Sequence, residues 1–272
     1  MRRSRPSGGL VAAVITFGLT GAAWGLDGRR RSRRAALVHR TMVELLLNTL
    51  CAGDSDTAHH SRRVADLTDV LARTFRLNRE ARARLRVGAL LHDLGKLDGE
   101  VAPLVQSDQR LDDRERRVVR RHTLESADIL QPLESIHPGI SLIVESHHEH
   151  WDGSGYPQGL ASAQIPLESR IISVADVFDA LTQSRSYHAP VQADEALAKL
   201  RAEAGTTFDP QVVARLHRPE VWKAWLEIAH EGRAEEQLVA TGSYRITRPI
   251  RSQRAAVMKR GKGRSSERST EK

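Results

Sequence analysis

The sequence predicts an all-α protein. Its 272 residues are enough to bury a sizeable hydrophobic core in one or two domains. Along most of the central part, apolar residues recur at the helical spacing of three and four. No segment alternates apolar and polar residues with comparable strength, as a half-buried strand next to a hairpin turn would. We therefore expect residues 36–230 to form one bundle of helices.

The first element is an uncharged, apolar run over residues 6–26 with arginines on both sides. As a helix, these 21 residues would extend about 30 Å, the thickness of the hydrocarbon layer of a membrane. Five arginines between residues 29 and 34 favour a cytoplasmic location for the remainder of the chain. Residues 1–35 are thus expected to be a single-pass anchor in the inner (cytoplasmic) membrane. A cleaved secretory signal is the alternative, because the small residues at 21–23 would suit a signal peptidase.

Helical periodicity predicts the elements of the bundle one after another. The strongest patterns cover residues 37–50, 61–75 and 79–94, and the last of these ends at Gly95, a residue that often terminates helices. After residue 231 the pattern fades into Arg-, Ser-, Gly- and Lys-rich sequence, which predicts a basic, disordered tail over 231–272. Further helices are expected over residues 112–131, 138–148, 166–182, 191–203, 209–217 and 219–230.

The net charge of +8 would by itself suggest a nucleic-acid or anionic-membrane partner. That charge is located at the two ends, however. Residues 1–35 carry +7 and residues 231–272 carry +6, which leaves −5 for residues 36–230. Because the central domain is acidic, we expect it to bind no specific nucleic acid. The low aromatic content of 4% excludes an extended base-stacking surface, and the single Cys51 excludes disulfide frameworks and multi-cysteine zinc clusters.

The histidines point to metal chemistry. Nine of the twelve fall between His59 and His188, and several stand beside carboxylates at predicted helix ends. Imidazoles mixed with carboxylates suit borderline to hard transition metals. The set exceeds what one octahedral ion can take, so two ions sharing a carboxylate such as Asp93 would use it economically and could activate water for attack on a phosphate. The candidate ligands are Asp56, His60, His92, Asp93, His122, His147, His148 and Asp176.

Each of these residues also has a simpler structural explanation. A single histidine at a helix end is more often a cap or a surface residue, and Lys96 could be a solvated lysine favoured by the helix dipole. Asp176 could be a hydrogen-bonded acid in the core, although an unpaired buried carboxylate is costly. Residues 153–157, Gly-Ser-Gly-Tyr-Pro, could be a surface turn. All of these explanations would have to hold together, whereas one metal site accounts for the whole set.

The order of the motifs resembles the HD-GYP family, a branch of the HD-domain metal-dependent phosphohydrolases. His92-Asp93-Leu94-Gly95-Lys96 matches the first motif of that family. Residues 147–157, His-His-Glu-His-Trp-Asp-Gly-Ser-Gly-Tyr-Pro, match the second. Residues 176–185 and 205–210 continue the match in the family's order, so that the resemblance spans residues 50–217.

This resemblance implies an HD-domain helical bundle with extra C-terminal helices that hydrolyses cyclic di-GMP to pGpG or GMP through a metal-bridging hydroxide. It implies two divalent ions, iron or manganese. A third ion is left open, because Asp56 stands where members with an additional metal often have Glu. Asp93 and Lys96 are implied to be catalytic, with Lys96 on the scissile phosphate. The residues implied to bind or shape the substrate site are Lys96, Gly155, Tyr156, Pro157, Arg185 and His188, the last standing where a lysine is common.

Two other functions remain compatible with the sequence. One is a phosphohydrolase acting on a different (cyclic) nucleotide, since metal ligands determine the chemistry but not the base. The other is a non-catalytic receptor that binds cyclic di-GMP and acts through protein contacts. A homodimer is also left open, because Gly21 and Gly25 form a GxxxG pattern, which is weak support for helix pairing.

Overall fold

The computed structural model describes residues 41, 43, 45, 47, 55–105, 107, 109–183 and 189–240. Regular structure in this part of the chain is helical, apart from an isolated bridge between Ala204 and Phe208, which confirms the all-α fold class. Contacts divide the chain into a unit Met1–Ala234, to which the packing below belongs, and a unit Glu235–Lys272. Of the helix expected over 37–50, the four described residues are helical, with Val43 and Leu47 buried.

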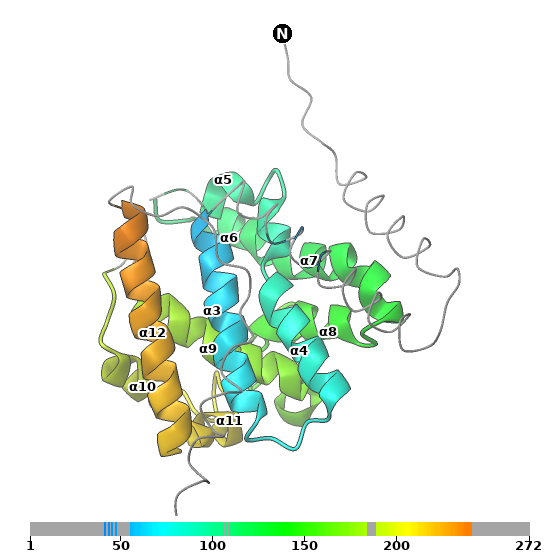
Figure 1. The fold of residues 1–272 in the computed structure, drawn as a ribbon. Helices are drawn as coiled ribbons and strands as arrows, with labels where there is room; N and C mark the ends of the chain where they lie inside the picture. Colours follow the sequence, from blue (N-terminus) through cyan, green and yellow to red (C-terminus); the bar gives the residue numbers. More distant parts are fainter. Residues whose placement is uncertain are drawn as a thin grey trace, which may run out of the picture. The chain divides into compact units, whose positions relative to one another are not determined.

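Three helices form the part of the core that carries the first motif. Helix α3 (Ser55–Ala72) packs along α4 (Arg79–Leu91), and α9 (Leu167–Thr182) crosses both of them (Figure 1). The side chain of Asn78 caps α4 by accepting a hydrogen bond from the backbone nitrogen of Ala81 at 2.8 Å. Large, fully buried side chains of these helices include Leu67, Leu71, Leu85, Leu91 and Phe178.

A second group of short helices packs beside α4 and α9. Helix α7 (His122–Leu130) contacts both α8 (Ile140–Glu145) and the 3₁₀ turn η2 (Leu94–Leu97), and η4 (Ser146–His148) contacts α9. As a result, the ends of α4 and α8 and the beginning of α7 all lie near the middle of α9. The remaining elements of this group are α5 (Ala102–Val105), α6 (Asp113–Arg120) and η3 (Gln131–Ser135).

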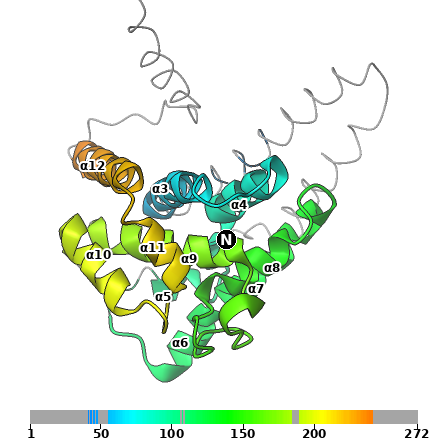
Figure 2. The ribbon, with the colours of Figure 1, turned by 90° about the horizontal axis from the view of Figure 1, so that it is seen from below.

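The C-terminal helices pack on α9 and beside α3. Helices α10 (Ala193–Ala202) and α11 (Pro210–Arg215) pack on α9, and α12 (Pro219–Ala240) runs beside α3 (Figure 2). The ring of Trp225 in α12 is fully buried, with its centroid 4.7 Å from that of Phe178. Its Nε1 donates to the backbone oxygen of Leu67 at 3.2 Å, which joins α12 to α3. The 3₁₀ turn η5 (Ser162–Gln164) precedes α9.

Several predicted helix boundaries are wrong. Helix α3 begins at Ser55, whereas the prediction began at residue 61. The prediction missed the first turns because the positions buried there include the polar residues His60 and Ser61, which an apolar pattern does not detect. Residues 112–131 form two helices, α6 and α7, which meet at Arg121. Helix α12 continues to Ala240, so the boundary predicted at residue 230 lies inside it.

Gly95 does not terminate a helix. Helix α4 ends at Leu91, and Gly95 lies in η2 against the backbone of α7. A Cβ atom there would collide with the carbonyl oxygen of His122 and would lie 2.8 Å from the nitrogen of Ser126. The need for glycine therefore comes from close approach between two backbones.

No helix among the described residues is long and apolar enough to cross a membrane. The anchor expected over residues 6–26 lies outside the described residues, as does the tail beyond residue 240.

Replacing Trp225 with alanine tests the packing of α12 on the core. We expect Trp225→Ala to lower the free energy of unfolding by about 3–5 kcal/mol, because a large, fully buried ring is lost. Urea denaturation followed by circular dichroism measures the change. Trp222→Ala, which removes a partly exposed ring of the same helix, is the matched control with a smaller loss. Equal losses for both variants would contradict this packing.

Candidate metal centre

Seven of the predicted ligands come together from five places in the fold. His60 lies in the second turn of α3, His92 and Asp93 follow α4, and Asp176 lies in the middle of α9. His122 begins α7, and His147 and His148 belong to η4. The ligand atoms of His60, His92 and Asp93 lie within 4.8 Å of one another, and those of His122, His147 and His148 do the same. We call these sets the first and the second cluster.

Asp93 joins the two clusters. Its Oδ2 lies 3.3 Å from Nε2 of His92 and 3.8 Å from Nε2 of His60, whereas its Oδ1 lies 3.5 Å from Nε2 of His122 in the second cluster. Asp176 adds a second carboxylate to the first cluster, because its Oδ1 lies 3.0 Å from Nε2 of His60 and 3.9 Å from Nε2 of His92. The arrangement is that of two adjacent sites with one shared carboxylate.

The histidine rings are oriented by their other nitrogen. Nδ1 of His92 lies 2.8 Å from the oxygen of Ala89, and Nδ1 of His122 lies 2.7 Å from the oxygen of Val119. His147 makes the same contact, at 2.5 Å, with the residue three positions before it. Since a carbonyl oxygen only accepts, each Nδ1 carries the proton, and Nε2 presents a lone pair to the cluster.

These atoms fit divalent ions. The Nε2 atoms of His92, His122 and His147, together with Oδ1 of Asp93, are buried and have no hydrogen-bond partner among the described residues. Buried polar atoms without partners are costly, and lone pairs that face a carboxylate need a cation between them. Nitrogen and oxygen donors without sulfur are the ligands of first-row transition metals. The two His/Asp clusters are therefore consistent with a binuclear metal site.

Burial keeps the second cluster neutral. It lowers the pKa of His122 to about 4 and that of His148 to about 3, and it holds the pKa of His147 well below its ordinary value. Asp93 behaves in the opposite way. Burial opposes its ionisation, but the charges of His92 and then Lys96 outweigh burial and hold its pKa well below the usual range. At neutral pH the second cluster thus offers neutral imidazoles, and Asp93, which faces it, offers a charged carboxylate.

Lys96 places a positive charge at the edge of the shared carboxylate. Its Nζ donates to Oδ2 of Asp93 at 2.6 Å, and its side chain is partly exposed. Lys96 belongs to η2, which contacts α7 closely at Gly95. The cation therefore lies where the site opens to solvent.

The predicted substrate loop lies against the second cluster. The ring of Tyr156 stacks on that of His148 at 5.0 Å, and the guanidinium carbon of Arg120 lies 4.8 Å from the centre of the tyrosine ring. At Gly155 a Cβ atom would lie 2.6 Å from the oxygen of His148, so only glycine fits there. The peptide bond between Tyr156 and Pro157 is cis.

Buried polar residues to which the sequence motifs assign no role hold this loop and this site. The carboxylate of Glu149 is buried and accepts three backbone N–H groups, from Gln158 at 2.6 Å and from Gly159 and Leu160 at 3.1 Å. Asp179 accepts from Arg63 and contacts His60. In the sequence, these two residues could have been found from their spacing. Arg63 follows His60 by three residues, one helical turn, and Asp179 follows Asp176 by the same distance.

The segment 205–210 anchors the loop from the other side. The backbone nitrogen of Trp151 donates to the oxygen of Thr207 at 3.1 Å. Asp209 caps α11 by accepting from the nitrogen of Gln211, and it accepts a 2.7 Å hydrogen bond from Arg170 of α9. This motif therefore supports the site without belonging to either cluster.

Three predicted site residues cannot be placed. Arg185 and His188 lie outside the described residues, and Asp56 is described only as part of the backbone of α3. The proposed contacts of Arg185 and His188 with the substrate, and of Asp56 with a third ion, stay predictions.

In this site, helix ends bring two His/Asp clusters around one shared aspartate, Asp93. This arrangement identifies the class of protein to which the chain belongs. A family model described as "HD domain" matches residues 44–212, and the chain belongs to that family. The order of its His-Asp and Gly-Tyr-Pro motifs makes it an HD domain protein of the HD-GYP type.

Relatives share this domain. The chain is 40% identical over 162 residues to the 3'3'-cGAMP-specific phosphodiesterase 3 of Vibrio cholerae, covering 60% of this chain and 35% of the relative. It is 38% identical over 167 residues to the cyclic di-GMP phosphodiesterase response regulator RpfG of Xanthomonas campestris, covering 61% and 44%. The chain thus spans less than half the length of either relative. A solved HD-GYP-type structure from Bdellovibrio bacteriovorus has the same fold, with a TM-score of 0.51, 18% identity and coverage of 82% and 71%.

The pKa values of the second cluster predict how the metal-free protein responds to acid. Below the ordinary histidine pKa of 6.5, His122 and His148 take up protons in the unfolded chain, but in the folded chain they do so only near 4 and 3. The unfolded state then binds more protons. We therefore expect the free energy of unfolding to fall by about 1.4 kcal/mol per pH unit for each such histidine as the pH drops through this window.

Urea denaturation of metal-free protein at several pH values measures this slope. His148→Asn removes one titrating group and serves as the matched variant, with a shallower slope. A free energy of unfolding that stays constant through the window would contradict the assignment.

Proposed function

We propose that this chain is a metal-dependent phosphodiesterase that hydrolyses cyclic di-GMP. The observation that carries the proposal is the shared carboxylate of Asp93, which faces the first cluster with one oxygen and the second cluster with the other. Two adjacent cation sites with a common ligand suit the hydrolysis of a phosphodiester. The names of the relatives, which include cyclic di-GMP phosphodiesterases, support the same reaction.

Each cluster would hold one divalent ion, iron or manganese, with Asp93 between them. The ions would supply Lewis acidity for the phosphate and activate water at neutral pH. Lys96 would bind the scissile phosphate, since its ammonium group stands at the partly exposed edge of the site beside Asp93. Burial, followed by the charge of Asp93, raises the pKa of Tyr156, so its hydroxyl stays protonated and can donate to a bound nucleotide.

The second candidate substrate is 3'3'-cGAMP. Relatives named as 3'3'-cGAMP-specific phosphodiesterases are 40% and 38% identical to this chain, as close as the cyclic di-GMP phosphodiesterase from Xanthomonas campestris at 38%. The two cyclic dinucleotides differ in one purine and share the phosphodiester linkage that the clusters would attack. We propose cyclic di-GMP as the main substrate and pGpG or GMP as the product.

Turnover by the full chain, purified without oxygen and loaded with Mn²⁺ or Fe²⁺, tests this function. We expect hydrolysis of cyclic di-GMP that chelation abolishes. His92→Ala and Asp93→Ala should remove metal and turnover together while leaving the helical content intact. Lys96→Met should retain metal but slow turnover by roughly 10²-fold, because one cation aimed at the phosphate is lost. Chromatography of the products measures each rate.

A parallel assay with 3'3'-cGAMP decides between the two substrates. Faster hydrolysis of 3'3'-cGAMP would replace the proposed substrate. Tight binding of cyclic di-GMP without any product, in metal-loaded protein, would overturn the enzymatic function in favour of a receptor.

On the sequence alone, we also propose that residues 6–26 anchor the chain in the inner membrane, with the catalytic domain in the cytoplasm. The uncharged run and the arginines directly after it support this topology.

Fractionation of cells that express the full chain checks the anchor. We expect the full chain in the membrane fraction after a salt wash, because apolar insertion does not depend on charge. A chain that begins at residue 36 should appear in the soluble fraction. Release of the full chain by salt would contradict a spanning helix.

A further inference from the structure

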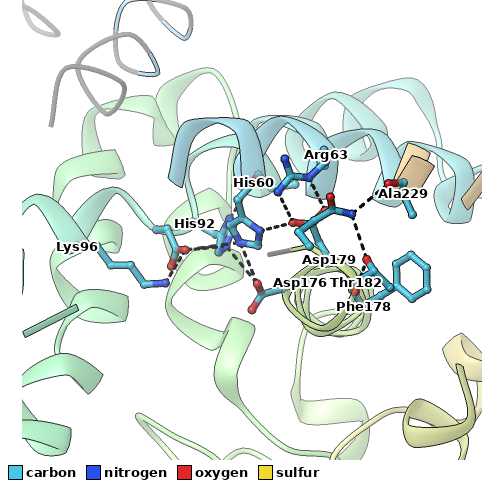
Figure 3. A network of polar contacts seen from close by, with 12 residues as sticks. His60, Arg63, His92, Lys96, Asp176, Phe178, Asp179, Thr182 and Ala229 are labelled. Atoms are coloured by element: carbon cyan, nitrogen blue, oxygen red, sulfur yellow. Dashed lines mark hydrogen bonds and ion pairs between the residues drawn. The ribbon is translucent and has the colours of Figure 1, made fainter. Parts of the chain in front are cut away.

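His60 is oriented differently from the other buried histidines of the site. The Nδ1 atoms of His92, His122 and His147 contact carbonyl oxygens three residues earlier, within their own stretch of chain. Nδ1 of His60 instead lies 2.7 Å from Oδ2 of Asp179, on α9 (Figure 3). The direction of its Nε2, 3.0 Å from Asp176, therefore depends on a side chain from another helix.

Asp179 is itself held by Arg63. The guanidinium group donates through Nε to Oδ1 at 2.7 Å and through Nη2 to Oδ2 at 3.0 Å. Both side chains are buried. Burial would raise the pKa of Asp179, but the charge of Arg63 outweighs it and lowers the pKa. Asp179, held by these two hydrogen bonds, accepts a hydrogen bond from Nδ1 of His60, which leaves Nε2 with a lone pair.

Helix α12 closes the other side of this pair. At Gly232 an added Cβ atom would lie 2.5 Å from Cδ of Arg63 and 2.8 Å from Oε1 of Gln183. Nε2 of Gln183 donates to the backbone oxygen of Ala229, one turn earlier in α12, at 3.3 Å. The backbone of α12 therefore occupies the space beside Arg63, although this helix begins after residue 212, where the HD-domain match ends.

We propose that Arg63 and Asp179 are positioning residues for the first cluster, and that α12 keeps them in place through its bare backbone at Gly232. The chain of contacts runs from Gly232 to Arg63, from Arg63 to Asp179, and from Asp179 to His60. This proposal rests on the proposed function, because these contacts position a ligand of the metal site that the function requires. Docking of α12 then acts on the affinity of the first metal site, since His122 and His147 of the second cluster are oriented by carbonyl oxygens of their own stretch of chain and not by this pair.

Titration of the metal-free full chain with Co²⁺, followed by visible absorption, tests the proposal. We expect the parent chain to bind two ions. In Asp179→Asn, which breaks the paired hydrogen bonds with Arg63, binding of one ion should weaken by roughly 10–100-fold while the other is unchanged. Gly232→Ala should weaken the same ion, because the added methyl group displaces Arg63.

Gly232→Ala also separates positioning from folding. Alanine has the higher helix propensity, so the substitution favours α12 itself, and it replaces no residue of the metal site. The matched control is Gly99→Ala, where an added Cβ meets nothing within 4 Å and both ions should bind as in the parent. Thermal unfolding of the metal-free variants reports any general loss of stability. If Asp179→Asn does not fold, the Co²⁺ affinities of Gly232→Ala alone decide the test.

Two results would overturn the proposal: parental affinity for both ions in Gly232→Ala and Asp179→Asn, or equal weakening of both ions in step with lost stability. Neither depends on a substrate. A parent chain that binds two Co²⁺ ions but hydrolyses no cyclic dinucleotide would contradict the proposed function alone. The positioning role of Arg63 and Asp179 would not be affected by that result.

Discussion

The buried carboxylate of Asp93 is the group on which the rest of the structure depends. Its charge survives burial only because His92 and Lys96 offset the cost of desolvation. Each oxygen faces a different cluster, so Asp93 couples the junction after α4 to the beginning of α7. The elements around Asp93 are short helices and 3₁₀ turns, so several helix ends meet at this one place. Long helices would contact the site only through residues in their middle.

The fold class and most of the site were predictable because they depend on local patterns. The helical periodicity of 166–182 became α9 with nearly the same limits, since buried apolar residues recur between Ile171 and Phe178. Where the buried face is polar, the pattern failed, as in the first turns of α3 around His60. The break at Arg121 also left no apolar signal, because the residues on both sides of it continue a helical sequence.

The clustering of the ligands was predictable from residue types, but their support was not. The motifs name His60 and Asp176, and the structure shows these two side chains 3.0 Å apart. They do not indicate that Asp179 turns the ring of His60, since that contact joins residues 119 positions apart. The expectation that Gly95 ends a helix was wrong for a similar reason. Its nearest neighbours belong to α7, and contact between two backbones leaves no trace in local sequence.

The close approach of Gly95 to α7 has a consequence for the tolerance of the site to mutation. The contact lies between the loop that carries Asp93 and the helix that begins with His122. It consists of close main-chain approach together with a 2.8 Å hydrogen bond from the Gly95 nitrogen to the side-chain Oγ of Ser126. The separation of the two clusters is thus set by the backbone. One methyl group at Gly95 would push the two halves of the site apart.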